Sequence, residues 1–419
     1  MYRRILRQGC AVGEKMKRIL IMTYHPLYPV DHGAIIRVIE EAKFLSENGF
    51  EVHLAGSRTS KEGLKKVKEM TNAEVHSYPL SLVRSGILLM LNKINKSLSR
   101  KFSNPFSYWF SPPVKYDIAN IIKKVKPHII QCEFIFLSYP ISKIARKYGI
   151  PLVISEHNIE FVRLVKEGVV SAEREEELKR FERDLCNSTN FVTTVSEEDK
   201  QKLRTIGVHT PIEVIPNGID YNRYQISKEV REETRRKYGI RREDVVLVFH
   251  GTLNYRPNVD ANKILINYIF PELSKRYENL KLLLIGPRHP REIGEKVIQL
   301  PAIPFDEFPE HLSMGDIGVV PLMAGSGTRL KIIEYLALGI PTISTEIGAE
   351  GLPVTDSKDI IIAKDAKEDF VEKTIKLLED KELQERMREK GKKLVREKLD
   401  WNVVLRKYLE IYSKLLAQK

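Results

Sequence analysis

Short apolar runs alternate with longer segments of helical periodicity along most of this chain. The runs are rich in Val, Ile and Leu, which is typical of strands that are buried on both faces of a parallel sheet. Because parallel strands need a crossover connection, usually a helix, the alternation predicts an α/β fold of two doubly wound parallel sheets. The predicted strands cover 18–23, 51–56, 127–132, 151–156, 191–195 and 212–218 in the first half and 245–251, 280–286, 317–322 and 341–345 in the second.

The length of the chain also predicts two domains. A chain of 419 residues is too long for one hydrophobic core and suits two domains of about 150 to 200 residues each. Pro216 and Gly218 interrupt the pattern where a hinge fits. We expect domains over 16–224 and 225–399, followed by a helical segment over 400–419.

Composition excludes several classes of protein. Hydrophobic residues make up 42% of the chain, and no run of about 18 uninterrupted apolar residues indicates a transmembrane helix. Cys10, Cys132 and Cys186 are too far apart for a metal motif or a disulfide framework, so we expect a reducing, cytoplasmic compartment. Residues 1–16 lack the apolar core of a signal peptide, and Met16 is a candidate start.

The segment LMAGSGTRLKIIEYLALGIP (322–341) joins a glycine turn to an apolar helix. Gly325 and Gly327 permit positive φ and let a ligand approach the main chain closely. The helix predicted over 329–338 begins directly after this turn. Its first amides have no partner within the helix and attract anions.

Three charged residues lie in the first turns of this predicted helix. Arg329 and Lys331 add full positive charge, so a diphosphate would meet amides and cations together. Glu334 lies where a carboxylate could accept hydrogen bonds from the paired hydroxyls of a ribose. The alternative is an ordinary loop followed by solvated helix residues. A second glycine-bearing loop over 346–351, after the strand TIST, favours the ligand site because ligands of open α/β sheets lie at strand ends.

The run GSGTRLKIIEYLALGIPTISTEIGAEGL closely resembles the donor-site signature of the retaining GT-B glycosyltransferases of the family 4, or glycosyl transferases group 1, type. Further resemblances lie in KRILIMTYHPLYPVDHGAIIRVIEEAKFLSENGFEVHLAG, ISEHNIEFVR, VTTVSEEDKQKL, VIPNGIDYNRY and FHGTLNYRPNVDAN. Together they cover nearly all of 17–401.

The resemblance implies two Rossmann-like domains that face a central cleft. The domain over 16–224 would hold the acceptor, the domain over 225–399 would bind the nucleotide sugar, and the helix over 400–419 would pack back on the first domain. The implied reaction moves a sugar from a nucleotide-diphosphate sugar to a hydroxyl of a glycan or lipid-linked acceptor with retention.

The resemblance also implies site residues. His157 would face the donor sugar, the alternative being a structural loop histidine. Gly33 would keep its loop close to the phosphate, and His32 lies in the same loop with no assigned role, as a candidate to face the acceptor. His157, Gly33 and His32 are the candidate catalytic residues. Glu156 and Glu160, which flank His157, are either a catalytic carboxylate pair or residues that lie behind the site or are exposed. The implied donor-binding residues are Arg256, Gly325, Ser326, Gly327, Thr328, Arg329, Leu330, Lys331 and Glu334.

The chain departs from the family pattern at three positions. Many members carry two glutamates separated by seven residues, the first on the donor sugar and the second on the ribose. Glu334 matches the second, but the first position is Ser326, so the donor sugar is not implied. Many also place an Arg and a Lys, aimed at the diphosphate, where this chain has Thr252 and Asn258. Arg256, Arg329 and Lys331 are the candidate substitutes.

No Asp-x-Asp pair occurs, so neither a metal site nor a cofactor is predicted. We expect helix amides, Arg329 and Lys331 to stabilise the leaving nucleoside diphosphate, and the acceptor hydroxyl to attack on the same face, assisted by the leaving phosphate.

The formal charge of +13 indicates anionic partners. Nucleic acid is not favoured, because no nucleic-acid-binding motif is visible. The segment 81–102 has cations, no acidic residue and an apolar stripe at helical spacing. It is either a helix at an anionic membrane surface, at the inner face of the cell membrane, or a core-facing helix with a basic face.

Two other functions stay open. One is a sugar-nucleotide epimerase or phosphorylase on the same fold, since fold does not define chemistry. The other is a catalytically silent glycan-binding or assembly protein, which Ser326, Thr252 and Asn258 motivate.

Overall fold

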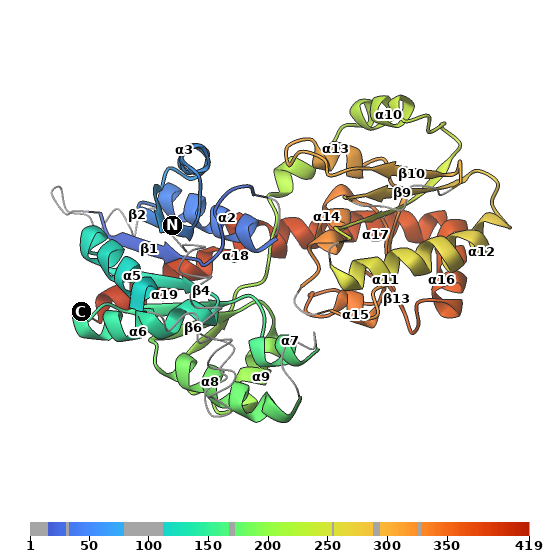
Figure 1. The fold of residues 1–419 in the computed structure, drawn as a ribbon. Helices are drawn as coiled ribbons and strands as arrows, with labels where there is room; N and C mark the ends of the chain where they lie inside the picture. Colours follow the sequence, from blue (N-terminus) through green and yellow to red (C-terminus); the bar gives the residue numbers. More distant parts are fainter. Residues whose placement is uncertain are drawn as a thin grey trace. The chain divides into compact units, whose positions relative to one another are not determined.

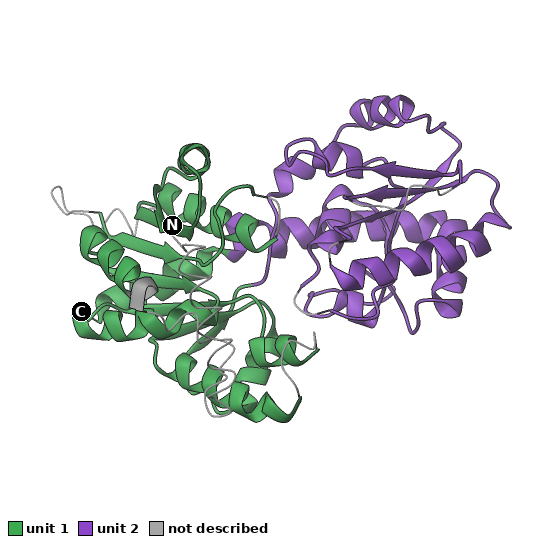
Figure 2. Cartoon of the chain, in the orientation of Figure 1, with its two compact units in different colours: residues 1–215, 405–419 green, residues 216–404 purple. Residues whose placement is uncertain are grey.

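The computed structural model describes residues 16–30, 33–78, 112–166, 172–253, 255–287, 294–325 and 328–418. The chain divides into two compact units, which Figure 2 shows in different colours. Unit 1 holds 1–215 and 405–419, and unit 2 holds 216–404. The division after Ile215 falls earlier than the sequence predicted, because the segment that ends at Tyr224 already packs against the core of unit 2.

Unit 1 is built on a seven-stranded parallel sheet in the order β3-β2-β1-β4-β5-β6-β7 (Figure 1). The strand order reverses between β1 and β4, which is the switch point where ligands of open α/β sheets bind. The edge strand β3 was not predicted, because most of its side chains are partly or fully exposed and it has no apolar run. The strands are β1 (Arg18–Met22), β2 (Glu51–Ser57), β3 (Glu74–Tyr78), β4 (Ile129–Glu133), β5 (Leu152–Glu156), β6 (Phe191–Thr194) and β7 (Ile212–Val214).

Helices connect successive strands of unit 1, as parallel pairing requires. Serine side chains cap two of them, since Ser60 accepts a hydrogen bond from the amide of Gly63 and Ser196 accepts one from Asp199. The described helices are α2 (Gly33–Glu47), α3 (Lys61–Thr71), α5 (Pro112–Val125), α6 (Ile135–Tyr148), α7 (Glu160–Lys166), α8 (Glu175–Asn187), α9 (Glu197–Thr205) and α19 (Arg406–Ala417).

The C-terminal helix α19 packs against the sheet of unit 1. Tyr408 Oη lies 3.2 Å from Ser155 Oγ, and Lys407 Nζ lies 2.6 Å from Glu213 Oε1. Tyr412 donates a hydrogen bond from its hydroxyl to Gln131 Oε1, at the switch-point strand β4. The last segment of the chain therefore completes the first unit.

Unit 2 has a six-stranded parallel sheet in the order β10-β9-β8-β11-β12-β13. Its switch point lies between β8 and β11. The edge strands β10 and β13 were not predicted, because they are short and lack long apolar runs. The strands are β8 (Val245–His250), β9 (Leu280–Ile285), β10 (Val297–Leu300), β11 (Ile317–Val320), β12 (Thr342–Thr345) and β13 (Ile361–Ala363). The confirmed fold class is therefore two parallel-sheet α/β domains.

The helices of unit 2 cover both faces of this sheet (Figure 1). Because crossovers are right-handed, the helices that lead from β8 to β9 and the helix that leads from β11 to β12 lie on opposite faces. The described helices are α10 (Lys228–Lys237), α11 (Arg256–Ile264), α12 (Phe270–Ser274), α13 (Phe308–Leu312), α14 (Leu330–Leu338), α15 (Glu346–Ala349), α16 (Glu368–Glu379), α17 (Lys381–Leu394) and α18 (Trp401–Val404).

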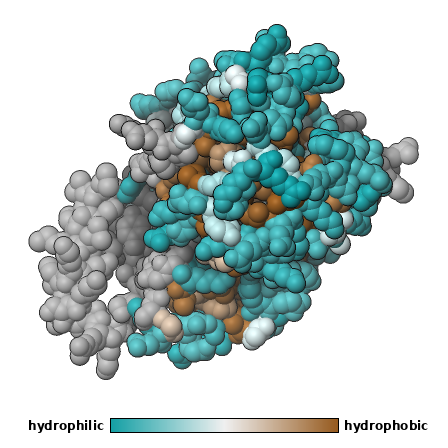
Figure 3. Space-filling model, turned by 90° about the vertical axis from the view of Figure 1, so that its right-hand side faces the viewer, coloured by the Kyte–Doolittle hydropathy of each residue, from teal (hydrophilic) through white to brown (hydrophobic). Residues whose placement is uncertain are grey.

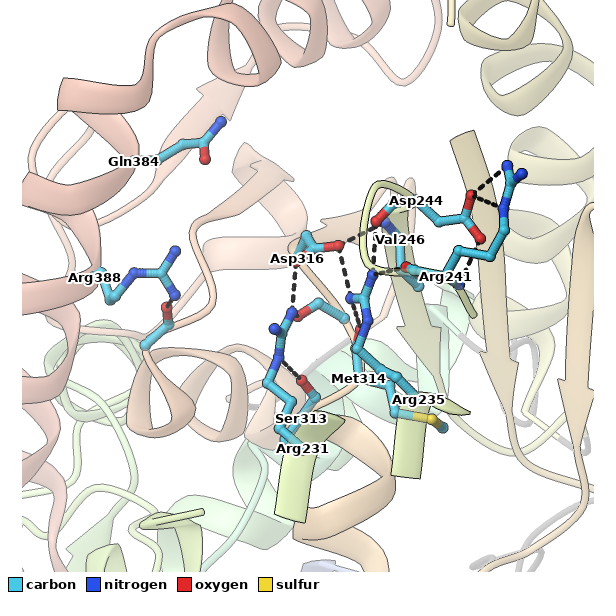
Figure 4. A network of polar contacts seen from close by, with 12 residues as sticks. Arg231, Arg235, Arg241, Asp244, Val246, Ser313, Met314, Asp316, Gln384 and Arg388 are labelled. Carbon is cyan, nitrogen blue, oxygen red and sulfur yellow. Dashed lines mark hydrogen bonds and ion pairs between the residues drawn. The ribbon is translucent and has the colours of Figure 1, made fainter. Parts of the chain in front are cut away.

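Two arginines fasten α10 to the rest of unit 2 (Figure 4). Arg231 Nη2 lies 2.5 Å from Asp316 Oδ1, and Arg235 Nη1 lies 3.0 Å from Asp316 Oδ2. Arg235 also donates to the carbonyls of Met314 and Asp244 at 2.8 Å and 2.6 Å. These bonds hold a very polar helix that buries few apolar side chains of its own.

On the face in Figure 3, the described residues are mostly hydrophilic, and hydrophobic residues show in patches between them. Across the ranges that the structure describes, no helix combines the length and apolar character needed to cross a bilayer. The basic segment 81–102 lies outside the described residues.

Candidate functional site

The predicted donor-site helix, α14, begins after the loop that follows β11, at the switch point of the unit 2 sheet. Gly325 in this loop has a φ of +128°, where a side chain would be strained. A Cβ there would lie 2.7 Å from Arg329 Nη2 and 3.0 Å from Tyr255 Oη. Gly325 thus leaves room for a guanidinium and a phenol beside the main chain. Ser326 and Gly327 lie outside the described residues.

The two cations predicted to meet a diphosphate are both buried. Arg329 is 7% exposed and Lys331 is 8% exposed. Arg329 stands immediately before the first residue of α14, and Lys331 follows in the first turn. Their charges therefore add to the partial positive charge of the helix start in a nearly dry environment.

Lys331 is held without a carboxylate partner. Its Nζ lies 2.9 Å from Asn258 Oδ1 and 4.1 Å from the ring centre of Phe249. No described aspartate or glutamate lies within ion-pair distance of this nitrogen. Burial, and then the charge of Arg329, lowers the pKa of Lys331 to about 7. A buried ammonium in this state favours an anionic ligand.

Asn258 is therefore part of the site. It stands where many relatives would place a lysine, and its amide Nδ2 donates to the carbonyl of Thr252 at 3.0 Å while its Oδ1 accepts from Lys331. The amide thus orients the lysine of α14. From the sequence, Asn258 was interpreted only as the loss of a lysine charge, because the residues around it give no indication that it bonds to Lys331, 73 positions later.

Both oxygens of Glu334 have close neighbours within the protein. Tyr224 Oη lies 2.9 Å from Oε1, and His250 Nε2 lies 2.9 Å from Oε2. Burial by itself raises the pKa of Glu334, but His250, Tyr224 and Lys331 outweigh it and bring the pKa below its ordinary value. Glu334 is therefore a carboxylate, which is the form that accepts hydroxyl hydrogen bonds.

Sequence reasoning missed His250 and Tyr224. His250 ends β8, and Tyr224 lies just before α10. The sequence did contain a signal for His250 as a site residue, because it is a polar residue at the end of a buried strand next to the switch point, where ligands bind.

The other predicted donor residues lie in different surroundings. Thr328 Oγ1 accepts a hydrogen bond of 2.5 Å from Asn217 Nδ2. Leu330 packs on the hydrophobic core. Arg256 begins α11, but its side chain is 81% exposed and pairs with Asp260 at 2.8 Å. In this conformation the guanidinium of Arg256 adds little positive charge to the site of the buried Arg329 and Lys331.

The predicted catalytic residues belong to unit 1. Gly33 is the first residue of α2, directly after the loop that leaves β1, and His32 lies outside the described residues. His157 follows β5 and is buried, with Nε2 2.6 Å from Glu133 Oε2 and its ring stacked on Phe134 at 4.2 Å.

A buried polar network continues inward from His157. Gln131 Nε2 lies 2.5 Å from Glu133 Oε1 and 2.6 Å from Glu41 Oε2, and Glu41 pairs with Arg37 at 2.7 Å. Burial raises the pKa of Glu133, and burial followed by the charge of Glu133 raises the pKa of Glu41 to about 7. His157 is thus a fixed side chain at the carboxyl end of the sheet. The carboxyl groups of Glu133 and Glu41 lie behind it, and both have a raised pKa.

Glu156 and Glu160, the other possible carboxylate pair, are buried at 1% and 2% exposure. Glu160 pairs with Arg163 at 2.5 Å. Burial, then Glu182 and Glu160, raises the pKa of Glu156 well above its ordinary value. Glu156 therefore binds a proton more readily than an ordinary glutamate, and because both residues are buried, neither is an exposed carboxylate.

No described group of three or more His, Cys, Asp or Glu residues is arranged to hold a metal ion.

Two family models match the chain. The model "Glycosyltransferase Family 4" covers residues 32–223, and the model "Glycosyl transferases group 1" covers residues 244–380. These ranges contain every strand of the two sheets except β1, and all the predicted site residues.

A curated relative is the GDP-mannose-dependent alpha-(1-6)-phosphatidylinositol monomannoside mannosyltransferase of Mycolicibacterium smegmatis, 25% identical over 193 residues. The match covers 42% of this chain and 49% of the relative, so the chain spans about half the length of that protein.

Solved structures share the fold over nearly the whole chain. HepE of Anabaena in complex with UDP-glucose has a TM-score of 0.71 at 15% identity and covers 95% of this chain and 99% of that one. A putative UDP-N-acetylglucosamine 2-epimerase of Listeria monocytogenes has a TM-score of 0.58 at 11% identity, covering 94% of this chain and 95% of that one. At these identities the likeness shows the fold alone.

Proposed function

Because this chain belongs to the GT-B glycosyltransferases of the family 4 and group 1 type, we propose that it transfers a sugar from a nucleotide-diphosphate sugar to a hydroxyl of a glycan or lipid-linked acceptor. The proposed reaction proceeds with retention and without a metal ion. The donor binds at the start of α14, and the acceptor binds at unit 1.

The observation that carries this proposal is the burial of Arg329 and Lys331 at the start of one helix. Burying a lysine without a carboxylate partner costs free energy. A diphosphate offsets that cost, because it supplies negative charge and several acceptor oxygens at the same place. Glu334 lies one turn further along, as a ribose partner requires.

The chemistry of the leaving group follows from the same residues. Negative charge grows on the nucleoside diphosphate as the glycosidic bond breaks, and preorganised cations and amides stabilise it. The chain has no Asp-x-Asp pair that would bind a metal to the diphosphate.

The donor and the acceptor class are proposed from relatives. The mannosyltransferase of Mycolicibacterium smegmatis is named as GDP-mannose-dependent, and HepE was solved with UDP-glucose. We place the reaction in the cytoplasm, with the basic segment 81–102 at the inner face of the cell membrane.

Titration calorimetry with UDP and GDP tests the donor site. We expect Arg329→Ala and Lys331→Ala to weaken binding roughly 10- to 100-fold each, because a charge-assisted contact is worth about 1.5–3 kcal/mol. Arg276→Ala is the matched control, since Arg276 is an exposed arginine paired with Glu379. Unchanged affinity in both site variants would contradict the proposed site.

Product analysis with GDP-mannose, UDP-glucose and lipid or glycan acceptors tests the reaction. A glycosylated acceptor with the donor's anomeric configuration, formed equally well with EDTA, supports metal-independent, retaining transfer. An epimerised or phosphorolysed donor would assign the chain to the other enzyme class, and no turnover of any donor would make it a binding protein.

A further inference from the structure

The close contact between Glu334 and His250 is the part of unit 2 that neither the family signature nor the buried cations explain. The imidazole Nε2 lies 2.9 Å from Oε2, while Tyr224 Oη lies 2.9 Å from Oε1. The Glu334 carboxylate is thus contacted by two elements that are far apart in sequence, the end of β8 and the turn before α10.

His250 itself has little freedom to move. Its ring meets Phe308 edge-on at 5.0 Å and Tyr335 edge-on at 5.4 Å. Its backbone amide donates to Tyr335 Oη at 3.2 Å. The aromatic contacts therefore hold the imidazole next to Glu334.

The close pair is badly aligned. Within the part of the chain that the structure describes, neither His250 Nε2 nor Glu334 Oε2 makes a hydrogen bond of good geometry, although both atoms are buried. Buried polar atoms in native proteins almost always have such a bond. A hydroxyl group that donates to Oε2 and accepts from Nε2–H satisfies both atoms at once.

We propose that His250 is a positioning residue for Glu334, and that the two together make the donor site select a ribose over a 2′-deoxyribose. The inference rests on the proposed function, because it assigns the ribose hydroxyls of the nucleotide to this carboxylate. A site whose buried polar groups need a hydroxyl rejects the analogue that lacks it.

The electrostatics of the pair agree with this role. His250 is the foremost of the contacts that lower the pKa of Glu334 against the effect of burial. Without the imidazole, less opposes the effect of burial, so the carboxyl group binds a proton at higher pH than in the wild-type protein. A neutral carboxylic acid accepts hydroxyl hydrogen bonds less well than a carboxylate.

The experiment measures the affinities of the full-length chain for UDP, GDP and their 2′-deoxy counterparts by titration calorimetry. We expect the wild-type protein to bind the ribonucleotide at least about tenfold more tightly than its deoxy form, which corresponds to about 1.4 kcal/mol. His250→Phe should reduce this ratio to within about twofold of unity, because the imidazole N–H is lost and Glu334 is no longer held in place by it.

Two further variants keep the test specific. His250→Gln keeps an N–H donor and should restore most of the discrimination. His311→Phe removes another buried imidazole of unit 2, one that lies 3.0 Å from Tyr238 Oη and makes no contact with Glu334, and should leave the ratio unchanged. A general loss of stability would affect both phenylalanine variants alike.

The pH profile supplies an independent readout. In His250→Phe the affinity for the ribonucleotide should fall on acidification at a higher pH than in the wild-type protein, since the pKa of Glu334 is no longer held down. Equal discrimination in wild-type and His250→Phe proteins overturns the inference while nucleotide binding upholds the function. Absence of any nucleotide binding overturns both.

Discussion

At the scale of single residues, the proposed donor site has its positive charge at another position than the family pattern implies, and the charge is not lost. The lysine that many relatives have at position 258 is an asparagine here, and its amide holds Lys331 from α14 at 2.9 Å. The cation thus comes from the helix after β11 instead of the helix after β8. The site keeps a buried positive charge, which a diphosphate needs.

Lys331 should couple nucleotide binding to the uptake of a proton. Its pKa in the free protein is about 7, and a bound diphosphate restores a higher value. Between about pH 7 and 10 the complex therefore binds a proton that the free protein lacks, and affinity falls by up to about tenfold per pH unit as pH rises. Calorimetry at pH 8 in buffers of different ionisation enthalpy measures this uptake.

The control for this prediction is Lys331→Arg, which cannot lose its proton and should show no uptake from this position. The same shift affects folding. Because the unfolded lysine keeps a pKa of about 10.4, the free chain should grow more stable as pH rises from about 7 to 10. Nucleotide binding without proton uptake in the wild-type protein would contradict the coupling.

At the scale of elements, α10 shows how a helix without an apolar face is held in place. Its two buried residues are Thr234 and Arg235, and it depends on bonds to Asp316, Met314 and Asp244 (Figure 4). Hydrogen bonds to charged groups contribute more than neutral ones. The helix is therefore tied to the strands β8 and β11 that border the switch point.

We expect Arg235→Met to lower the free energy of unfolding of unit 2 by about 2–3 kcal/mol, because it leaves two buried carbonyls without their donor. The matched change Arg231→Met should cost less than about 1 kcal/mol, because the Arg231 side chain is 33% exposed and solvent screens its ion pair. Urea denaturation followed by circular dichroism measures both. Equal costs would show that burial does not set the contribution of these arginines.

At the scale of the whole molecule, unit 1 is discontinuous in sequence. Its sheet is complete by Val214, yet α19 joins it from the far end of the chain. Tyr408 and Tyr412 of α19 bond to Ser155 and Gln131 on the central strands β5 and β4. The first unit therefore reaches its final stability only when the last helix has been made.

Truncation after Val404 should destabilise unit 1 and spare unit 2. We expect amide hydrogen exchange to accelerate in β4 and β5, while β8 and β9 keep their protection. Tyr412→Phe, which leaves Gln131 Oε1 without this donor, should cost a smaller amount, about 1–2 kcal/mol. Similar acceleration in both units would contradict this assignment of α19.

The amino-acid sequence by itself determined the α/β class, the two parallel sheets and the α14 signature, because these depend on local periodicity and on the special φ of residues such as Gly325. It did not reveal the edge strands β3, β10 and β13, which are short and lack long apolar runs. The assignment of Arg256 to the donor site stays a prediction, and in the structure its side chain is exposed and pairs with Asp260. Only the tertiary structure decided that Asn258 bonds to Lys331 and that His250 and Tyr224 contact Glu334. The residues of these pairs are 73, 84 and 110 positions apart in sequence, and the parallel topology brings them together.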